Sequence, residues 1–325
     1  MADRQGSLFS KLDISLSGTA VAASVWTFPV IVPGLLWMQL FSPLPVFYYL
    51  YDSGYAKGIN TLAAALVLTG AVAAITGTAA ALVFTFILLP TGYSMARSAF
   101  MGNSPVKTGM KGLAALLVGW LIWSVIHGVT HQVGLYQEIL TTVDGSVAAA
   151  GQAIIASSEL SAEHVAQLQT TFDQLRKLLP GIMPGLLFIT MLNSIFCNLL
   201  LGQWLLHRFS RTNLPWPPFR EWRLPEQMVV TVIAAGITFL LPVEFFKVLG
   251  LNLLFAAGTL YLFQGIAVLG TLLHKWSVPT ALKVLVYLLI LVQAYGVIML
   301  AFLGVADIWV DFGKEKPISP EENDK

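Results

Sequence analysis

Long apolar stretches separated by short polar loops dominate the hydrophobic pattern of this chain. The pattern predicts two packed helices over 59–96, joined near residues 76–78, and single helices over 16–38, 113–133, 183–206, 228–247, 251–273 and 281–303. An apolar helix of about 20 residues can cross ~30 Å of hydrocarbon. We therefore predict an all-α, polytopic helical bundle that is integral to a membrane.

A shorter element begins at Pro43. Pro43 and Pro45 can open a helix, and Gly54 can close it. With roughly ten residues at about 1.5 Å each, this helix is too short to span a bilayer, so we expect a half-helix or a re-entrant piece. If the chain crosses here, the bundle has about nine spans and the N-terminus is inside; if it re-enters and returns, about eight spans remain and the N-terminus is outside.

A proline- and arginine-rich segment over residues 208–226 interrupts the apolar stretches. Its prolines remove N–H donors and push the residues before them out of the α region, so we predict a non-helical hinge. Aromatic and basic side chains interleave in it, a mixture that is typical of the lipid headgroup boundary on the cytoplasmic side. The candidate interface anchors are Trp216, Arg220, Trp222 and Arg223.

The polar and apolar segments also set the order of the chain: a polar N-terminal segment (1–15), N-terminal transmembrane helices (16–133), an extracytoplasmic helical segment (134–180), one transmembrane helix (181–207), the hinge (208–226), C-terminal transmembrane helices (227–304) and an acidic tail (305–325). Lysine and arginine favour cytoplasmic loops. By this rule the loop over 97–111, the hinge and Lys275 are cytoplasmic, whereas 132–179 and the tail lie outside.

The outer segment contains a candidate amphipathic helix. Ser161 can cap its start, with Glu163 in the first turn, and apolar residues recur at three- and four-residue steps from Val165 to Leu179. Because its polar face is not basic, we expect it to lie across the outer mouth of the bundle rather than to bind anionic lipids. It could serve as a spacer at the interface or as a lid over a site.

Composition agrees with a membrane protein and argues against other classes. Hydrophobic residues make up 56% of the chain and charged residues 11%, and the mean hydropathy is +0.75. The net charge of +1 says nothing about nucleic acid, but the lack of basic runs argues against a nucleic-acid partner. The single cysteine, Cys197, cannot form an internal disulfide.

No motif for a cofactor or for catalysis stands out. The sequence has neither a Gly-rich phosphate loop followed by Lys-Ser/Thr nor a Cys pair or His-Glu-x-x-His for zinc. His127 and His131 are four residues apart and could offer two imidazoles to one metal, but no third ligand is visible. No nucleophile and base can be paired by spacing. We therefore predict no metal and no cofactor, and a protein that is not an enzyme.

Polar side chains inside the apolar stretches are the remaining candidates for a site. An unpaired amide in hydrocarbon is costly, so these groups should face the bundle interior. They can join helices or line a pocket for a small molecule. Glu244 is suggestive because an acid in or near a span is a functional candidate, although Lys247 can neutralise it. The candidate pocket residues are Asn193, Glu244, Asn252 and Gln264.

Four short sequence motifs together match the pattern of a known family. They are Pro218-Phe-Arg-Glu-Trp-Arg-Leu-Pro-Glu226, Pro43-Leu-Pro45 with Gly54 and Gly58, Gln264-Gly265, and Gly304-x-x-Asp307-x-Trp309-x-Asp311. Together they resemble the YybS-like family of bacterial predicted membrane proteins, a domain of unknown function, over nearly the whole chain. That family is grouped with the substrate-binding S components of energy-coupling-factor vitamin transporters. The resemblance implies a helical core in which proline-started helices and glycine turns frame a ligand pocket, although the extra spans and the outer segment depart from a typical S component.

Two functions are compatible with these features. In the first, the protein is transport-related and binds a small molecule as an S component does, without its own ATPase, and it would need an energising membrane or ATPase partner. In the second, it is a non-transporting membrane scaffold or regulator whose working surface is the hinge, and the intramembrane amides only join helices. In both, it is a multi-pass protein of the bacterial inner (cytoplasmic) membrane, surrounded by the lipid bilayer.

Overall fold

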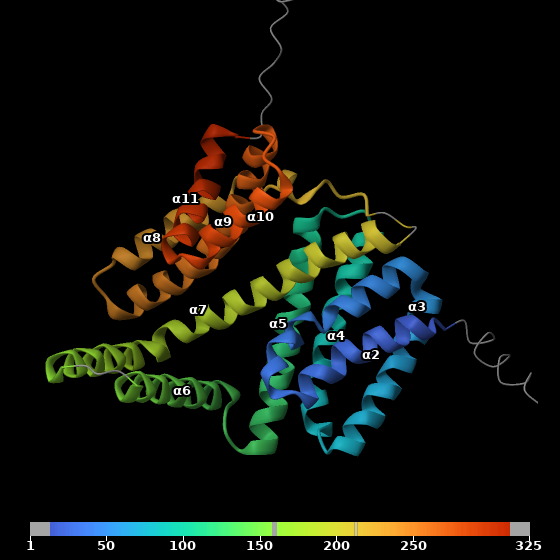
Figure 1. Cartoon of the computed structure of the whole chain (residues 1–325), viewed down its shortest axis with the longest axis horizontal. Coiled ribbons are helices and arrows are strands. Elements are labelled where there is room, and N and C mark those ends of the chain that lie inside the picture. The colour runs from blue at the N-terminus through green and yellow to red at the C-terminus, as the bar shows by residue number, and fades with distance from the viewer. Residues whose placement is uncertain (1–13, 158–160, 211, 213, 313–325) are drawn as a thin grey trace, which may run out of the picture. The chain divides into compact units, whose positions relative to one another are not determined.

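The computed structural model describes residues 14–157, 161–210, 212 and 214–312, and every regular element in these ranges is helical. The helices form two compact units: a first unit that ends at Trp216 and a second unit that begins at Pro217 (Figure 1). The boundary between the units therefore falls inside the predicted hinge. The predicted all-α fold class is confirmed.

Neighbouring helices of the first unit pack side by side from α2 to α5, and α7 packs on α3 and α5. The helices are α2 (Leu16–Ile31), the 3₁₀ helix η1 (Pro33–Phe41), α3 (Pro43–Thr76), α4 (Ala79–Phe100), α5 (Pro105–His131), α6 (Leu135–Ser157) and α7 (Ala162–Phe209). Glycines allow the close approaches. Gly92 of α4 packs against the backbone of Pro43 and Phe47, and Gly119 of α5 packs against the carbonyl of Ile87.

Two glycines set the path of α3. Gly54 has φ 76° and ψ 169°, a conformation that breaks the helix and that glycine adopts without a steric penalty. Beyond the break, Gly58 packs against the backbone of Tyr49. Gly77 caps the end of α3 in the left-handed conformation, with φ 72°, and α4 begins two residues later. The predicted break at Gly54 and the predicted junction near Gly77 are confirmed.

The outer segment differs from its prediction. Ser161 caps α7 as expected, since its Oγ accepts a backbone N–H of the first turn. The helix then continues over 48 residues to Phe209, so the outer helix and the following span are one element. Pro180 and Pro184 lie inside it without ending it, because a proline in an apolar helix kinks it while neighbouring groups satisfy the backbone. A separate helix across the outer mouth is therefore not confirmed.

The first part of α7 pairs with α6, as the green helices of Figure 1 show. The Arg176 guanidinium donates two hydrogen bonds of 2.7 Å to the Asp144 carboxylate. Gly151 of α6 gives room for the ring of Phe172, whose atoms come within 3.0 Å of a Cβ placed on that glycine. The segment from α6 into α7 is thus a two-helix hairpin with its own polar and apolar contacts.

In the second unit, α8 and α11 pack on α9. The elements are the 3₁₀ turn η2 (Phe219–Glu221), α8 (Met228–Leu240), α9 (Glu244–Lys275), α10 (Thr280–Val292) and α11 (Ala294–Val310). α9 and α11 approach closely at two glycines. A Cβ on Gly265 would collide with the carbonyl of Leu300, and a Cβ on Gly304 would collide with the carbonyl of Tyr261. This contact joins two of the sequence motifs.

The stretch predicted as one helix over 281–303 is broken. α10 ends at Val292, Gln293 is extended with φ −95° and ψ 125°, and α11 begins at the next residue. The two helices are bent by 108° at this break. Gly296 packs against the carbonyl of Ile290, a contact that leaves no room for a side chain. The prediction of one continuous helix here is wrong.

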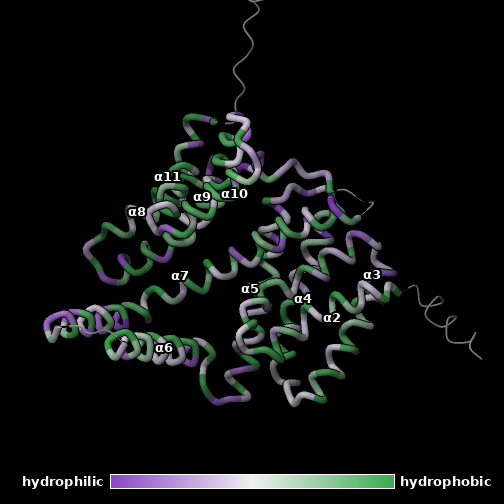
Figure 2. Tube along the Cα trace, in the orientation of Figure 1, coloured by the Kyte–Doolittle hydropathy of each residue, from purple (hydrophilic) through white to green (hydrophobic). Residues whose placement is uncertain are grey.

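Within the described residues, five helical stretches are long and apolar enough to cross a membrane: Gly34–Thr76, Pro105–His131, Leu135–Ser157, Ala162–Phe209 and Glu244–Lys275. The bent α10–α11 pair would add a sixth if it crossed. The predicted eight or nine spans are not confirmed. Hydrophobic residues recur along the helices of both units (Figure 2), and many large ones are exposed, among them Leu240 (78%) and Phe302 (70%). A bilayer would cover apolar surface of this extent.

Candidate functional site

The part of the hinge that lies in the second unit is a short turn with internal hydrogen bonds. Between Pro217 and α8 the only helical piece is the 3₁₀ turn η2. The indole N–H of Trp222 donates to the carbonyl of Pro217 at 3.0 Å, and the ring meets that of Phe219 edge-on, with centroids 5.4 Å apart. The predicted non-helical path of this part of the hinge is confirmed.

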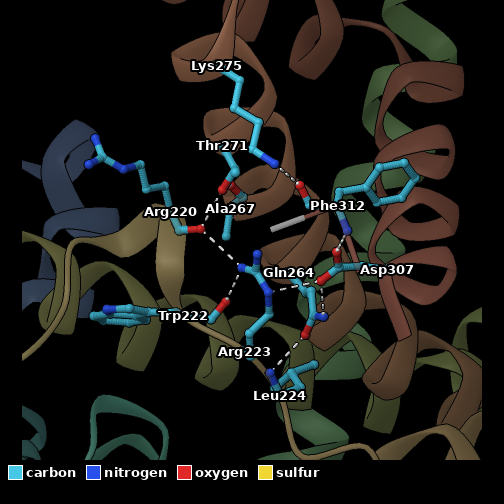
Figure 3. A network of polar contacts seen from close by, with 10 residues as sticks. All are labelled: Arg220, Trp222, Arg223, Leu224, Gln264, Ala267, Thr271, Lys275, Asp307 and Phe312. Carbon is cyan, nitrogen blue, oxygen red and sulfur yellow. Dashed lines mark hydrogen bonds and ion pairs between the residues drawn. The ribbon is translucent and has the colours of Figure 1, made fainter. Parts of the chain in front are cut away.

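Asp307, near the end of α11, is the centre of a polar network that reaches the hinge (Figure 3). Only 1% of its side chain is exposed. Its Oδ2 lies 3.1 Å from Arg223 Nε and accepts from the amide nitrogen of Gln264 at 2.9 Å, while its Oδ1 accepts from the backbone N–H of Phe312 at 3.1 Å. A buried carboxylate is costly unless it is paired and hydrogen-bonded. Three donors from three segments meet that requirement here.

Gln264 and Arg223 extend the network to the backbone of the hinge. The Oε1 of Gln264 accepts from the N–H of Leu224 at 2.8 Å, so both ends of this amide are engaged. The Nη1 of Arg223 donates to the carbonyls of Arg220 and Trp222 at 3.1 and 3.0 Å. We refer to Arg223, Leu224, Gln264 and Asp307 as the hinge network. It ties the hinge to both α9 and α11.

The ends of α9 and α11 lie side by side, next to the hinge. Lys275 Nζ donates to the carbonyl of Phe312 at 2.7 Å, and the hydroxyl of Thr271 donates to the carbonyl of Arg220 at 2.8 Å (Figure 3). α10 begins at Thr280, soon after Lys275, so the bent α10–α11 pair starts and finishes at the same end of α9. This is the geometry of a re-entrant pair.

This geometry corrects the predicted topology of the tail. The charge pattern assigned the hinge and Lys275 to the cytoplasmic side and Asp307 to the outside. Atoms within hydrogen-bond distance cannot lie on opposite sides of a hydrocarbon layer of ~30 Å, so the two assignments exclude each other. The charge rule counted the stretch over 281–303 as one crossing, whereas the structure bends it by 108° at Gln293. The rest of the tail, 313–325, lies outside the described residues.

Comparison with known protein families gives a match that includes the whole hinge network. The family described as Predicted membrane protein (DUF2232) matches residues 20–308. The chain belongs to this family. The matched range contains all four residues of the hinge network, and these come from three of the four motifs noted in the sequence. The fold therefore brings together parts of this DUF2232 chain that are far apart in sequence.

One curated relative is the Uncharacterized protein YybS of Bacillus subtilis (strain 168). It is 26% identical over 288 residues, which cover 86% of this chain and 89% of YybS. No solved structure matches the chain. The predicted resemblance to YybS is therefore confirmed, whereas the grouping with S components has no support in these matches and stays a prediction.

The four candidate pocket residues lie on two helices, and the three on α9 are spread along that helix. Asn193 lies in α7 of the first unit, where its amide donates to a carbonyl of its own helix at 3.0 Å. The other three lie on α9, where Asn252 donates to the carbonyl four residues before it at 2.7 Å. Asn252 and Gln264 are about 18 Å apart along the helix axis, and Glu244 is exposed at its start. For Gln264, the bonds fit the alternative role of joining helices.

The two tryptophans of the hinge pack against protein. Trp216, in the first unit, donates its indole N–H to the carbonyl of Asn103 at 2.8 Å and stacks on Phe47, with centroids 6.1 Å apart. Trp216 and Trp222 are each 8% exposed. Of the two candidate arginines, the side chain of Arg220 is 40% exposed and that of Arg223 is 31% exposed and paired with Asp307. The hinge is therefore held within each unit by its own contacts, and its contact with lipid headgroups stays a prediction.

The contact between His127, near the end of α5, and Glu138 of α6 was not predicted from the sequence. Nε2 of His127 lies 2.5 Å from the carboxylate of Glu138, and the ring of His127 stacks on that of His131, with centroids 4.4 Å apart. No group of three metal-ligating side chains that could hold a metal occurs in the described part of the chain. His127 therefore joins α5 to α6 through its contact with Glu138.

Replacing Trp222 by Phe should lower the free energy of unfolding by about 1 kcal/mol, because it removes the donor to Pro217 but keeps an aromatic ring against Phe219. Trp309 is 70% exposed, so Trp309→Phe is the matched control and should leave stability unchanged. Thermal melting of the purified variants in one detergent measures both effects. Equal melting temperatures would show that the indole hydrogen bond contributes nothing to the hinge.

Proposed function

We propose that this DUF2232 protein is a non-transporting membrane scaffold or regulator, not an enzyme, and that it acts through the hinge on the cytoplasmic side of a bacterial inner membrane. The observation that carries the proposal is the hinge network, in which Asp307 and Gln264 bind a side chain and a backbone group of the hinge. A segment held in this way loses little conformational freedom when a partner binds, which favours recognition.

The chemistry of the network favours a positioning role. A buried ion pair often adds little net stability, because the cost of desolvation offsets the attraction, and apolar residues would pack α9 against α11 as well. Arg223, however, bonds two carbonyls of the hinge in addition to Asp307. The guanidinium therefore dictates the path of the chain, which apolar side chains could not do.

The hinge also offers charged groups to a partner. The side chains of Arg220 and Glu221 are 40% and 54% exposed, and their charged atoms are 3.7 Å apart. Their backbone is fixed from the other side, since the carbonyl of Arg220 accepts from both Arg223 and Thr271. A cytoplasmic protein that presents an acid and a base at matching positions would fit this surface.

A transport-related role, with an S-component-like site and an ATPase partner, is the second candidate. The observation that favours it is the pair of broken helices, α3 at Gly54 and α10–α11 at Gln293, since discontinuous helices often frame the binding sites of transporters. Co-purification of the protein with an ATPase, or retention of a small molecule in native mass spectrometry, would favour this role over the scaffold.

Site-specific photo-crosslinking in cells tests the scaffold role. A photoreactive amino acid at Glu221 should capture one specific protein, and Asp307→Asn should abolish the capture because the hinge is released. The same amino acid at Leu240, which is 78% exposed at the far end of α8, is the control for unspecific capture. The role proposed for the network would be refuted if position 221 gave no crosslinked product. It would also be refuted if the product persisted unchanged in Asp307→Asn.

A further inference from the structure

Most of the start of α3 in the first unit is buried in protein. Ser42, the residue before the helix, is 0% exposed, and its carbonyl accepts from the indole N–H of Trp26 at 3.0 Å. Gly92 of α4 packs on the backbone of the first turn, and Gly202 of α7 packs on the ring of Phe47 in the same turn. Helices α2, α4 and α7 therefore all meet this turn.

Three side-chain oxygens in this region have no hydrogen-bond partner among the described residues: Ser42 Oγ, Thr91 Oγ1 and Asn198 Oδ1. All three residues are 0% exposed. Other helical threonines, such as Thr190 and Thr259, bond the carbonyl four residues before them at 2.9 and 2.8 Å. Thr91 makes no such bond. Because a buried polar atom without a partner costs free energy, several of them together point to a ligand.

The residues that carry the three oxygens come from segments that pack at the start of α3. The amide nitrogen of Asn198 donates at 2.7 Å to the carbonyl of Leu40, which is two residues before Ser42. Thr91 directly precedes Gly92, whose backbone packs against Pro43. The three residues thus belong to three segments that meet near the start of α3: the chain before α3, α4 and α7.

The donor set identifies the class of ligand. The amide nitrogen of Asn198 is already committed to the carbonyls of Leu40 and Ser194, so only its acceptor oxygen is left. Hydroxyl and amide oxygens are ligands for hard cations. No carboxylate, histidine or cysteine cluster that could hold a metal occurs in the described chain, and a divalent ion would require such charged ligands. A neutral oxygen set suits a monovalent cation.

The prolines at the start of α3 weaken the repulsion that a helix N-terminus exerts on a cation. The N-terminus of a helix repels positive charge through its unbonded N–H groups. Pro43 and Pro45 have no N–H, so among the first three residues of α3 only Leu44 carries this donor. The repulsion is therefore weaker than at an ordinary helix start.

We propose that Ser42, Thr91 and Asn198 form a site for a monovalent cation, Na⁺ or K⁺, at the start of α3. The site lies in the first unit and does not depend on the function proposed for the hinge. Because an ion that binds only the folded state stabilises it, the melting temperature should rise with the concentration of that ion.

Melting of the purified full-length protein in detergent tests the site, with NaCl, KCl and choline chloride compared at equal ionic strength. The parent protein should melt higher in NaCl or KCl than in choline chloride, by on the order of 3 °C. Ser42→Ala and Thr91→Val should each lose most of this difference. In choline chloride both variants should melt at or above the parent, because each lacks a hydroxyl without a partner. Thr190→Val, whose lost hydroxyl bonds its own helix, should keep the difference.

Three results would overturn the site. The parent could melt at the same temperature in all three salts. The difference could persist unchanged in both Ser42→Ala and Thr91→Val, which would assign it to ions bound elsewhere. Both variants could melt below the parent by the same amount in every salt, which would identify the ligand as a buried water molecule rather than an ion.

Discussion

Replacing Asp307 by Ala should lower the free energy of unfolding by about 3 kcal/mol, toward the lower end of the cost of breaking a buried ion pair. The substitution removes the acceptor of Arg223 Nε, of the Gln264 amide and of the Phe312 N–H at once. The cost lies at the lower end because the Arg223 side chain is 31% exposed, so water can solvate part of the released charge. Thermal unfolding of the purified parent and variant in the same detergent measures the loss.

A double-mutant cycle separates the pair from the rest of the network. Asp307→Leu alone leaves Arg223 without its partner, whereas Asp307→Leu with Arg223→Met removes both charges, so the double variant should be more stable than the single one. Asp173 is the matched control, because its side chain is 67% exposed and 4.0 Å from an arginine, and Asp173→Ala should change stability little. Strict additivity of Asp307→Leu and Arg223→Met would show that the two residues are not coupled.

Gly265→Ala should have the second large effect, a loss of about 3 kcal/mol of stability, because a methyl group there would collide with backbone rather than with a side chain that can move. The collision is with the carbonyl of Leu300, so α9 and α11 would have to separate. The same movement would pull Gln264 away from Asp307. Thermal melting measures the loss of stability, and the loss should be smaller in a variant that already lacks Asp307.

Gly258 provides a control on the same helix, since a Cβ there meets no atom within 4 Å. Gly258→Ala should be neutral or should stabilise the protein by up to about 1 kcal/mol, because alanine favours the helix over glycine. Opposite effects of the two substitutions would assign the loss at Gly265 to the contact with α11. If both variants melted like the parent, the close contact of the two helices would be disproved.

Local sequence signals predicted the boundaries of several elements correctly. Pro43 and Gly54 delimit the short helix, Gly77 ends α3, and Ser161 caps α7. Each of these signals acts within a few residues, through a missing N–H, a left-handed φ or a capping oxygen. Proline was the exception, because Pro180 lies inside α7 without ending the helix.

The arrangement of the second unit could not be read from local signals. The stretch over 281–303 is apolar except for Lys283 and Gln293 and has no proline, so it reads as one span, yet the chain bends at Gln293. The position of Asp307 follows from this bend, and its bond to Gln264 joins residues 43 positions apart. No periodicity reports such a pairing. The signal that was present is an acid one turn after a motif glycine, Gly304, in an otherwise apolar helix.

The hinge illustrates a different limit. Aromatic residues beside arginines are found both at lipid headgroups and inside folded turns, and composition does not distinguish the two. In this chain Trp216 and Trp222 are packed inside, because each indole N–H finds a backbone carbonyl. The same ambiguity applied to Gln264, whose amide could have served a ligand but instead bonds Leu224 and Asp307.

The contacts of Asp307 and Lys275 require the hinge, the end of α9 and the end of α11 to lie on one side of the membrane. Single cysteines at Trp276 and Val310, which are 67% and 60% exposed, mark the two helix ends in a Cys197→Ala background. A third cysteine at Val243, 51% exposed just before α9, marks the opposite end of that helix. The measurement is labelling by a membrane-impermeant maleimide in intact and in permeabilised cells.

We expect Trp276→Cys and Val310→Cys to react alike, only after permeabilisation, and Val243→Cys to react in intact cells. This pattern requires α9 to cross the bilayer and α10–α11 to return to the side they left. Labelling of Val310→Cys in intact cells, with Trp276→Cys still protected, would contradict the account, because the two helix ends would then lie on opposite sides of the membrane.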